Sequence, residues 1–584
     1  MKLISKYVLV VGVMSALLVS CSTSKKADKS GASRGKKSDS HLSANDKMNF
    51  ERAFYDASKE KMLNNFIESA NLYRKCLQID PSSAAANYEL ANLLFVKGQY
   101  ADAELYSRTA ALLQPQNEWY QILYADALTR NKKYSDALKV REKLAQTFPD
   151  RIDFLYDLAN GYLSMNKYDD AIRVYNNIEK DAGVMEDVIT QKEKIYLRQN
   201  KFDKAVAEVK KLIDSDPAEP RYYGMLAELY QANGMNDKAL ETFETAKKID
   251  PKNPYVHLAL SNYYAQSKEA AKAFDEMKIA FDNPDLDIDT KIKVLLGYYS
   301  MGQTSDTAKK EGYELLDLVE KNHATEAKTF SIYGDFLYRD KKLAEAKEKY
   351  TKAVALDKNR IAIWTQLLII ESQLNDYASM AKDSKEAMEL FPSEPTVYFF
   401  SGVAQLQLND YKQAIATFKK GIDLVVENKP LEGQLYANLG DAYYRDKQME
   451  KSDSAYEKAL EINPKDTYVL NNYSYYLSLR NVKLDRAEAM SRKANEIEPN
   501  NGNSQDTYAW ILYASAKYGE AKEWIEKAIA NGGEKNAVIL EHYGDILFKL
   551  NEKNKALEYW IKAKQAGKGS DFLEKKISEK TLFE

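Results

Sequence analysis

A small residue returns every 34 positions through the first half of the chain, at Ser69, Ala103, Ala137, Ala171, Ala205, Ala239 and Ala273. The series continues at intervals of 34, 35 or 38 residues, at Ala308, Ala346, Met380, Ala414, Ser452, Ala487, Ala521 and Ala556. Such a period is typical of repeat architectures, in which each unit buries its apolar face against its neighbours. The fifteen markers therefore predict one continuous array of fifteen units.

Each unit has the pattern of two amphipathic helices, with apolar side chains every three or four positions. The small residues fall where these two helices cross, because a bulky side chain there would hold the backbones apart. Aromatic residues begin several second helices, at Tyr100, Tyr134, Tyr168, Phe202 and Tyr411. A content of only 23 Gly and 13 Pro in 584 residues agrees with long helices and few tight turns.

The segment 433–466 carries the pattern most completely, as Tyr436-x-x-Leu439-Gly440-x-x-Tyr443, then Ser452-x-x-x-Tyr456, Ala459 and Pro464. This pattern resembles the tetratricopeptide repeat, and the resemblance extends over residues 50–569. It implies an all-α fold, a right-handed α-solenoid superhelix of about fifteen helix pairs. Phe572, Leu573, Ile577 and Leu582 then predict a C-terminal capping helix within 570–584.

Two intervals of 38 residues, from Ala308 to Ala346 and from Ala414 to Ser452, each add about one helical turn. The extra residues are expected either in a lengthened second helix or in the loop that follows it. The weakest copy lacks the Gly/Ala and Pro landmarks, and we expect a hinge there. The predicted organisation is a signal peptide at 1–20, a lipidated cysteine and flexible tether at 21–47, repeats 1–7 at 48–285, the degenerate repeat 8 at 286–326, repeats 9–15 at 327–569 and the cap at 570–584.

The N-terminus has the pattern of a secretory signal. Lys2 and Lys6 precede an uncharged apolar run at 7–18, which is short for a membrane span. The following Leu18-Val19-Ser20-Cys21 resembles the lipobox of bacterial lipoproteins, whose cysteine is cleaved to the first position and carries acyl chains such as palmitate. The alternative is an ordinary signal peptide with a chance cysteine. Because Ser22 follows Cys21 and no acidic run does, we expect an outer-membrane lipoprotein that faces the periplasm.

Motifs for catalysis and cofactor binding are missing from the sequence. It has no Gly-x-x-x-x-Gly-Lys phosphate loop and no His-Glu-x-x-His helix, and its Gly-x-Ser-x-Gly spacing at 31–35 lies in the predicted tether, away from the strand-to-helix turn that a nucleophile elbow needs. Two Cys and four His do not supply a disulfide framework or a four-ligand zinc site, and Cys76 fits a buried small-residue position. A net charge of -3 gives no basic field for nucleic acid. We therefore expect no enzyme, no cofactor, no metal and no small-molecule substrate.

The resemblance to tetratricopeptide arrays implies that the first helices line a concave face on which extended peptides bind. The position after the small residue of the first helix is polar or aromatic in ten units: Asn92, Asp126, Asn160, Glu228, Asn262, Asp335, Asp441, Tyr475, Trp510 and Asp545. These side chains either bond the backbone of a partner or solvate the wall and cap neighbouring groups. The sequence leaves both readings open.

Aromatic and amide side chains gather most densely on three consecutive first helices near the C-terminal end. Flat rings give contact area at a low entropy cost, which suits a groove for partner segments. The alternative for some of these rings is packing between repeats. The predicted partner-binding residues are Asn438, Asp441, Tyr444, Arg445, Asn471, Asn472, Tyr475, Asp506, Trp510 and Tyr513.

These features favour a non-catalytic protein-binding scaffold, anchored by lipid, that organises a complex of the cell envelope with other envelope proteins as partners. The chain is similar in architecture to tetratricopeptide lipoproteins of the Bacteroidetes envelope, some of which serve secretion or gliding machinery. The alternative is an accessory factor that recruits or regulates a peptidoglycan- or envelope-assembly enzyme. A repeat-bearing enzyme is disfavoured, because the repeats leave no room for a catalytic domain.

Overall fold

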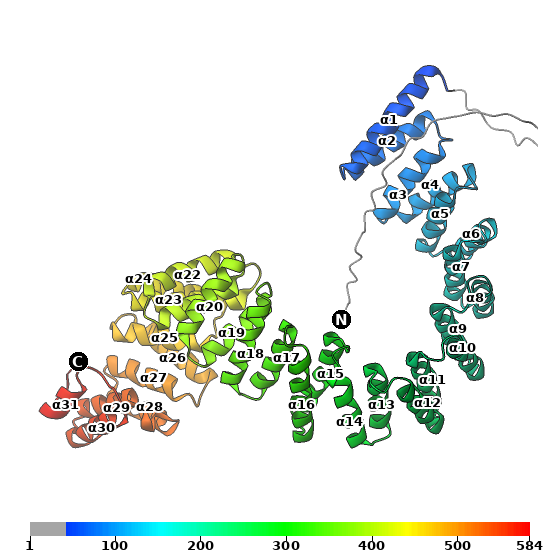
Figure 1. Cartoon of the computed structure of the whole chain (residues 1–584). Coiled ribbons are helices and arrows are strands. Elements are labelled where there is room, and N and C mark those ends of the chain that lie inside the picture. Colours follow the sequence, from blue (N-terminus) through cyan, green and yellow to red (C-terminus); the bar gives the residue numbers. More distant parts are fainter. Residues whose placement is uncertain (1–41, 584) are drawn as a thin grey trace, which may run out of the picture. The chain divides into compact units, whose positions relative to one another are not determined.

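The computed structural model describes residues 42–583, and within this range it contains 31 α-helices, one 3-10 helix and no strand. Helices α1 to α30 form fifteen consecutive pairs, in which each odd-numbered helix packs on the next helix (Figure 1). The predicted all-α class and the paired, tetratricopeptide-like arrangement are therefore confirmed. The predicted signal peptide and Cys21 lie outside the described residues.

The chain divides into two compact units between Pro217 and Ala218. The helices of the first unit are α1 Ala44–Met62, α2 Phe66–Ile79, α3 Ala84–Val96, α4 Tyr100–Leu113, α5 Glu118–Arg130, α6 Tyr134–Thr147, α7 Ile152–Ser164, α8 Tyr168–Ala182, α9 Glu186–Arg198 and α10 Phe202–Ser215. Since α1 begins at Ala44, the last four residues of the predicted tether are helical, and the first repeat begins earlier than predicted.

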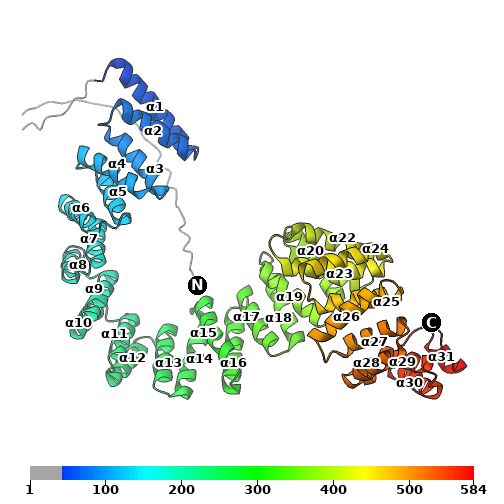
Figure 2. The ribbon, with the colours of Figure 1, turned by 180° about the vertical axis from the view of Figure 1, so that it is seen from behind.

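The second unit contains the remaining helices, which can be followed in Figure 1 and from behind in Figure 2. They are α11 Pro220–Ala232, α12 Asn236–Ile249, α13 Pro254–Gln266, α14 Ala270–Asp282, α15 Ile288–Met301, α16 Asp306–Asn322, α17 Ala327–Arg339, α18 Leu343–Leu356, α19 Ile361–Gln373, α20 Tyr377–Leu390, α21 Pro395–Gln407, α22 Tyr411–Leu424, α23 Lys429–Arg445, α24 Met449–Ile462, α25 Thr467–Leu479, α26 Leu484–Ile497, α27 Gly502–Ala514, α28 Tyr518–Ala530, η1 Gly533–Lys535, α29 Ala537–Lys549, α30 Lys553–Ala566 and α31 Leu573–Glu579.

Local chemistry fixes both ends of a helix pair. First helices are capped at their N-terminal ends by residues such as Asn117 and Asn501, whose side chains accept hydrogen bonds from backbone N–H groups of the first turn. In many pairs the turn between the two helices contains one residue in the left-handed conformation, for example Asn166 at φ 56° and Asn409 at φ 64°. Asn tolerates this conformation better than most residues, so the short turn costs little strain.

A ring on the second helix fills the notch that a glycine leaves on the first helix of the same pair. A Cβ added to Gly440 would lie 2.9 Å from ring atoms of Tyr456, and one added to Gly544 would lie 2.4 Å from Trp560. Both rings are fully buried. The predicted close helix crossing is thus a fit between a glycine and one aromatic ring.

The two long intervals have different structural causes. In the first, the second helix α16 has 17 residues instead of the usual 14, as one of the two predicted alternatives states. In the second, α22 has its usual 14 residues, and the first helix α23 has 17 instead of 13. The prediction for the second interval is therefore wrong, because the extra turn lies at the start of the next repeat.

The degenerate eighth repeat is the pair α15 and α16, whose side chains share one core with both neighbours. Leu295 and Leu315 pack with Phe281 of the preceding repeat and Phe336 of the following repeat. The boundary between the two compact units lies at Pro217, well before this repeat. The hinge at 286–326 stays a prediction.

Candidate functional site

A pocket of about 600 Å³ opens at the C-terminal end of the second unit. Three consecutive first helices line it with aromatic rings, since Tyr475 lies on α25, Trp510 and Tyr513 lie on α27, and α29 contributes His542. These helices pack side by side, α25 on α27 and α27 on α29. We call Tyr475, Trp510 and Tyr513 the aromatic wall.

Stacking fixes the rings at the centre of this wall. The rings of Trp510 and Tyr513 lie 4.7 Å apart and nearly parallel, one helical turn apart on α27. Trp510 also stacks on the imidazole of His542, with a centroid distance of 4.0 Å. Because each such contact stabilises the pair by about 0.5–1.5 kcal/mol beyond burial alone, the wall is a preorganised surface.

The imidazole of His542 is held from behind by a carboxylate. His542 Nδ1 and Asp506 Oδ1 are 2.8 Å apart, and both side chains are about 10% exposed. Burial opposes a charge on the ring, but Asp506 outweighs this effect and raises the pKa of His542. The pair therefore favours an imidazolium against the face of Trp510, as a cation–π contact requires.

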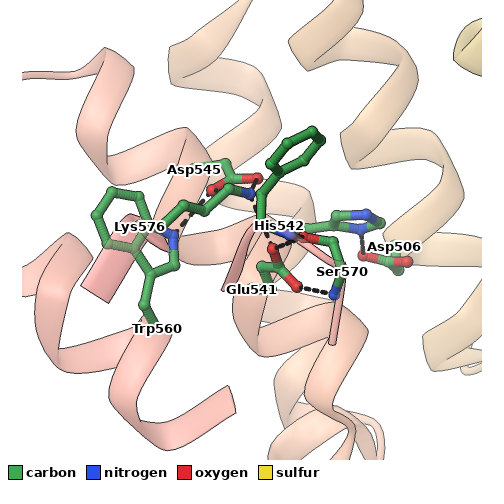
Figure 3. A network of polar contacts seen from close by, with 8 residues as sticks. Asp506, Glu541, His542, Asp545, Trp560, Ser570 and Lys576 are labelled. Carbon is green, nitrogen blue, oxygen red and sulfur yellow. Dashed lines mark hydrogen bonds and ion pairs between the residues drawn. The ribbon is translucent and has the colours of Figure 1, made fainter. Parts of the chain in front are cut away.

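A buried ammonium lies beside the wall, between two carboxylates of α29 (Figure 3). Lys576 Nζ is 2.9 Å from Glu541 Oε1 and 2.7 Å from Asp545 Oδ2. Trp560 Nε1 donates to Asp545 Oδ1 at 2.8 Å, and the backbone N–H of Ser570 donates to Glu541 Oε2 at 2.7 Å. All five of these groups come from α29, α30 or the chain beyond α30, so this network fastens the C-terminus to the last repeat.

The pKa values of the two carboxylates of this network are shifted in opposite directions. Burial raises the pKa of Asp545 to about 6, although Lys576 opposes the shift. Burial also acts on Glu541, but the hydrogen bonds from Ser570 and the charge of Lys576 outweigh it and lower the pKa of Glu541. Asp545 is therefore the group of this network that takes up a proton first when the pH falls.

The structure brings together only part of the predicted partner-binding set. Tyr475, Trp510 and Tyr513 line the pocket, and Asp506 supports it through His542. Asn471 and Asn472 line a separate cavity of about 320 Å³ between the start of α25 and the loop before α27. The other four predicted residues lie on the preceding first helix, α23, and are not part of the pocket lining: Asn438, Asp441, Tyr444 and Arg445.

Asp441 corrects the prediction most clearly, because its carboxylate is used inside the protein. It is 5% exposed and accepts hydrogen bonds from the hydroxyls of Tyr456 and Tyr468, both at 2.6 Å, and from Tyr476 at 3.2 Å. Tyr444 stacks on Tyr476 with a centroid distance of 3.7 Å. These contacts join two repeats, so the alternative of inter-repeat packing holds for Asp441 and Tyr444.

The recurring polar position after the small residue has the same explanation in three repeats. Asp335 accepts from Tyr350, Asp441 from Tyr456 and Asp545 from Trp560, and each donor stands 15 residues after its acceptor. The glycine before each Asp makes room for that same ring. For these residues the capping role, one of the two readings left open, is the one that the structure shows.

Four residues of the site were not predicted: Glu541, His542, Asp545 as an ion-pair partner, and Lys576. The sequence does contain a signal for the last of them. Leu573, Lys576 and Ile577 are spaced as one face of a helix, and a lysine on the apolar face of a short cap requires a buried anion.

The pocket offers flat aromatic surface, paired charges and hydrogen-bonding groups, which suit non-covalent binding of a polypeptide segment. Within residues 42–583, no cluster of three His, Cys, Asp or Glu side chains is placed to bind a metal. Over the same range, no helix combines the length and apolar character that crossing a bilayer requires.

Comparison with known proteins identifies the repeats. Tetratricopeptide repeat models match residues 63–127, 196–263, 395–424 and 433–466, and a model of anaphase-promoting complex (cyclosome) subunit 3 matches residues 96–178. The human protein O-mannosyl-transferase TMTC3 is 28% identical over 130 residues, which are 22% of this chain and 14% of that protein. Type IV pilus assembly protein PilF of Pseudomonas aeruginosa is 24% identical over 172 residues, which are 29% of this chain and 66% of PilF.

The chain thus spans less than two thirds of the length of either curated relative. A solved tetratricopeptide repeat protein from Parabacteroides merdae aligns with 44% of this chain and 98% of its own, at 17% identity and a TM-score of 0.36. The matched repeat models fall on helix pairs of both compact units. The chain is therefore a tetratricopeptide repeat protein.

Proposed function

We propose that this protein is a lipid-anchored scaffold of the cell envelope that binds segments of partner proteins against the aromatic wall. The observation that carries the proposal is the pocket of about 600 Å³, lined by rings from three successive first helices. Aromatic anchors in a preformed pocket are the residues that dominate the binding energy of protein interfaces.

The anchoring part of the proposal rests on the sequence before residue 42. A positive start, an apolar run and Leu18-Val19-Ser20-Cys21 favour lipidation of Cys21 and attachment to the periplasmic face of the outer membrane. Acyl chains contribute about 0.8 kcal/mol per buried CH₂, so the several chains of a lipoprotein hold it firmly. The scaffold would then organise an envelope complex, and a secretion or gliding machine is the finer form of this proposal. The match to a pilus assembly protein supports an assembly role.

The binding part is tested with a double variant, Tyr475→Ala with Trp510→Ala, used as bait in a solubilised envelope. We expect the variant to lose the partners that the wild-type chain captures. The matched control is Trp119→Ala with Tyr255→Ala, which removes one Trp and one Tyr that are more than half exposed elsewhere in the array. Equal capture by the wall variant and the wild type contradicts the proposal, provided that thermal melting shows both chains folded.

The anchoring part is tested with Cys21→Ser. We expect the wild-type chain to carry acyl groups on its first residue, as read by mass spectrometry of the N-terminal peptide, and to sediment with the outer membrane. The serine variant should lack the acyl groups and leave the membrane fraction. Protease treatment of intact cells should spare the wild-type protein, and digestion would instead indicate display on the cell surface.

A further inference from the structure

The C-terminal part of the chain itself occupies one end of the pocket. Residues 569–583, which we call the C-terminal segment, contribute Phe572, Lys576 and Phe583 to the same lining as the aromatic wall. Lys576 is 4% exposed and bonds two carboxylates of α29, Glu541 and Asp545. The ammonium of this segment thus shows which charge this end of the pocket accepts.

The segment is held by the polar contacts of Ser570 and Lys576 and by three apolar side chains, Leu573, Ile577 and Leu582. Helix α31 has only seven residues, and only Leu573 and Lys576 are buried within it. Phe572 is 46% exposed although it borders the pocket. A short element with so few buried contacts belongs to the low-stability end of a structure, where local opening is frequent.

The segment leaves much of the pocket to another ligand. A volume of about 600 Å³ is bordered by the segment and by Tyr475, Trp510 and Tyr513. A polypeptide that supplies an ammonium to Glu541 and Asp545 and an aromatic or aliphatic side chain to the wall would use both parts of the lining at once. Such a ligand can therefore compete with an intramolecular occupant, despite the high effective concentration of the latter.

We propose that the C-terminal segment is a built-in competitor, and that a partner segment carrying a lysine near an apolar side chain displaces it from Glu541 and Asp545. This inference rests on the proposed function, since it concerns the same pocket. It names the chemistry of the ligand, a primary ammonium for the two carboxylates and an apolar group for the aromatic wall. It also makes the free pocket the minor state of the resting protein, which lowers the apparent affinity for every partner.

The test uses the full chain and a fluorescent peptide with the sequence of residues 568–584 as the probe. Lys576→Met in the protein should weaken the internal occupant and raise the affinity for the probe by about tenfold or more, because a larger fraction of pockets is open. Lys568→Met removes an exposed lysine just before the segment and should bind the probe like the wild type. A probe in which the residue equivalent to Lys576 is Met should bind at least about tenfold more weakly to every protein.

A second measurement works without a mutation. Saturating probe added to the wild-type chain should accelerate hydrogen exchange of the amides in residues 569–583, because displaced amides lose their protection. Equal probe affinity of wild type and Lys576→Met, or unchanged exchange in the segment under saturating probe, would overturn the displacement. The proposed function then still stands if the wall variant loses its envelope partners. Capture of those partners by the wall variant would instead refute the proposed function, whatever the probe does.

Discussion

The indole N–H of Trp560 donates a 2.8 Å hydrogen bond to the carboxylate of Asp545, which follows the glycine that makes room for the same indole. At the crossing of α29 and α30, the same indole therefore both fills the space left by the glycine and donates a hydrogen bond to the neighbouring carboxylate. It places Asp545 in the interior, where the carboxylate then meets Lys576 of the C-terminal segment.

Gly544→Ala should destabilise the last repeats, because the added Cβ would lie 2.4 Å from the ring of the buried Trp560. Overpacking of this kind costs about 1–3 kcal/mol. Urea unfolding followed by tryptophan fluorescence is the measurement. Gly519→Ala on α28 is the control, since nothing lies within 4 Å of its added Cβ. That helix substitution should instead stabilise the protein, by up to about 1 kcal/mol.

The stability of the last repeats should rise when the pH falls from 7.5 to 5. The pKa of Asp545 is about 6 in the folded protein, above the ordinary value for Asp, so the folded state takes up a proton before the unfolded state does. The raised pKa of His542 acts in the same direction, because its contribution is full at low pH and is lost as the pH rises.

Asp545→Asn should flatten this pH dependence, since the amide does not titrate and only the share of His542 remains. Urea midpoints of wild type and variant at pH 5, 6 and 7.5 provide the comparison. A variant with the same slope as the wild type would show that Asp545 ionises normally in the folded state.

Asp441→Ala should destabilise the second unit by about 1–3 kcal/mol, because three tyrosine hydroxyls lose their common acceptor in a buried place. Asp441→Asn keeps one acceptor oxygen and should cost less. The melting temperatures of the two variants show which substitution destabilises the protein more. Neither should change partner capture when folded, and selective loss of a partner in Asp441→Asn would restore the sequence-based reading of this residue as a contact.

The eighth repeat, α15 and α16, should be less stable against local opening at pH 5.5 than at pH 7.5. His323 Nε2 lies 2.9 Å from the buried Lys291 Nζ, and burial together with this ammonium lowers the pKa of His323. The folded state therefore takes up this proton less readily than the unfolded state, so stability is lost as the pH falls through about 6.5. Hydrogen exchange of α15 and α16, corrected for the intrinsic rate at each pH, should show more opening at pH 5.5 than at pH 7.5.

His323→Gln is the matched variant for the eighth repeat, because its amide oxygen can accept from Lys291 without titrating. Its exchange should be equally protected at both pH values. Acid loosening of the same size in this variant would point to other groups of the repeat.

The sequence alone predicted the helix pairs well, because only a small residue fits where the two helices of a pair cross, and such residues therefore recur at a fixed spacing. A larger residue at Gly440 would collide with Tyr456, so the position of the small residue in the sequence marks the position of the helix crossing in the structure. The position of the added turn in α23 was beyond such reasoning. An interval between two markers counts residues, and it does not show whether the preceding loop or the following helix contains them.

The site was predicted in part for a similar reason. Tyr475, Trp510 and Tyr513 stand out as large rings on neighbouring first helices, and the structure places all three in one pocket. Asp441 has the same spacing within its repeat, yet its partners Tyr456, Tyr468 and Tyr476 make it internal. Which polar residue faces a partner depends on rings 15 to 35 residues away, and repeat spacing does not reveal those contacts.

The fit of Trp560 against Gly544, like that of Tyr456 against Gly440, is completed within a single helix pair. Duplication or loss of a whole pair would therefore carry both halves of the contact together and leave the neighbouring crossings intact. An array built in this way can change its length in steps of one repeat during evolution, and a step that falls before α25 leaves the pocket at the C-terminal end unchanged.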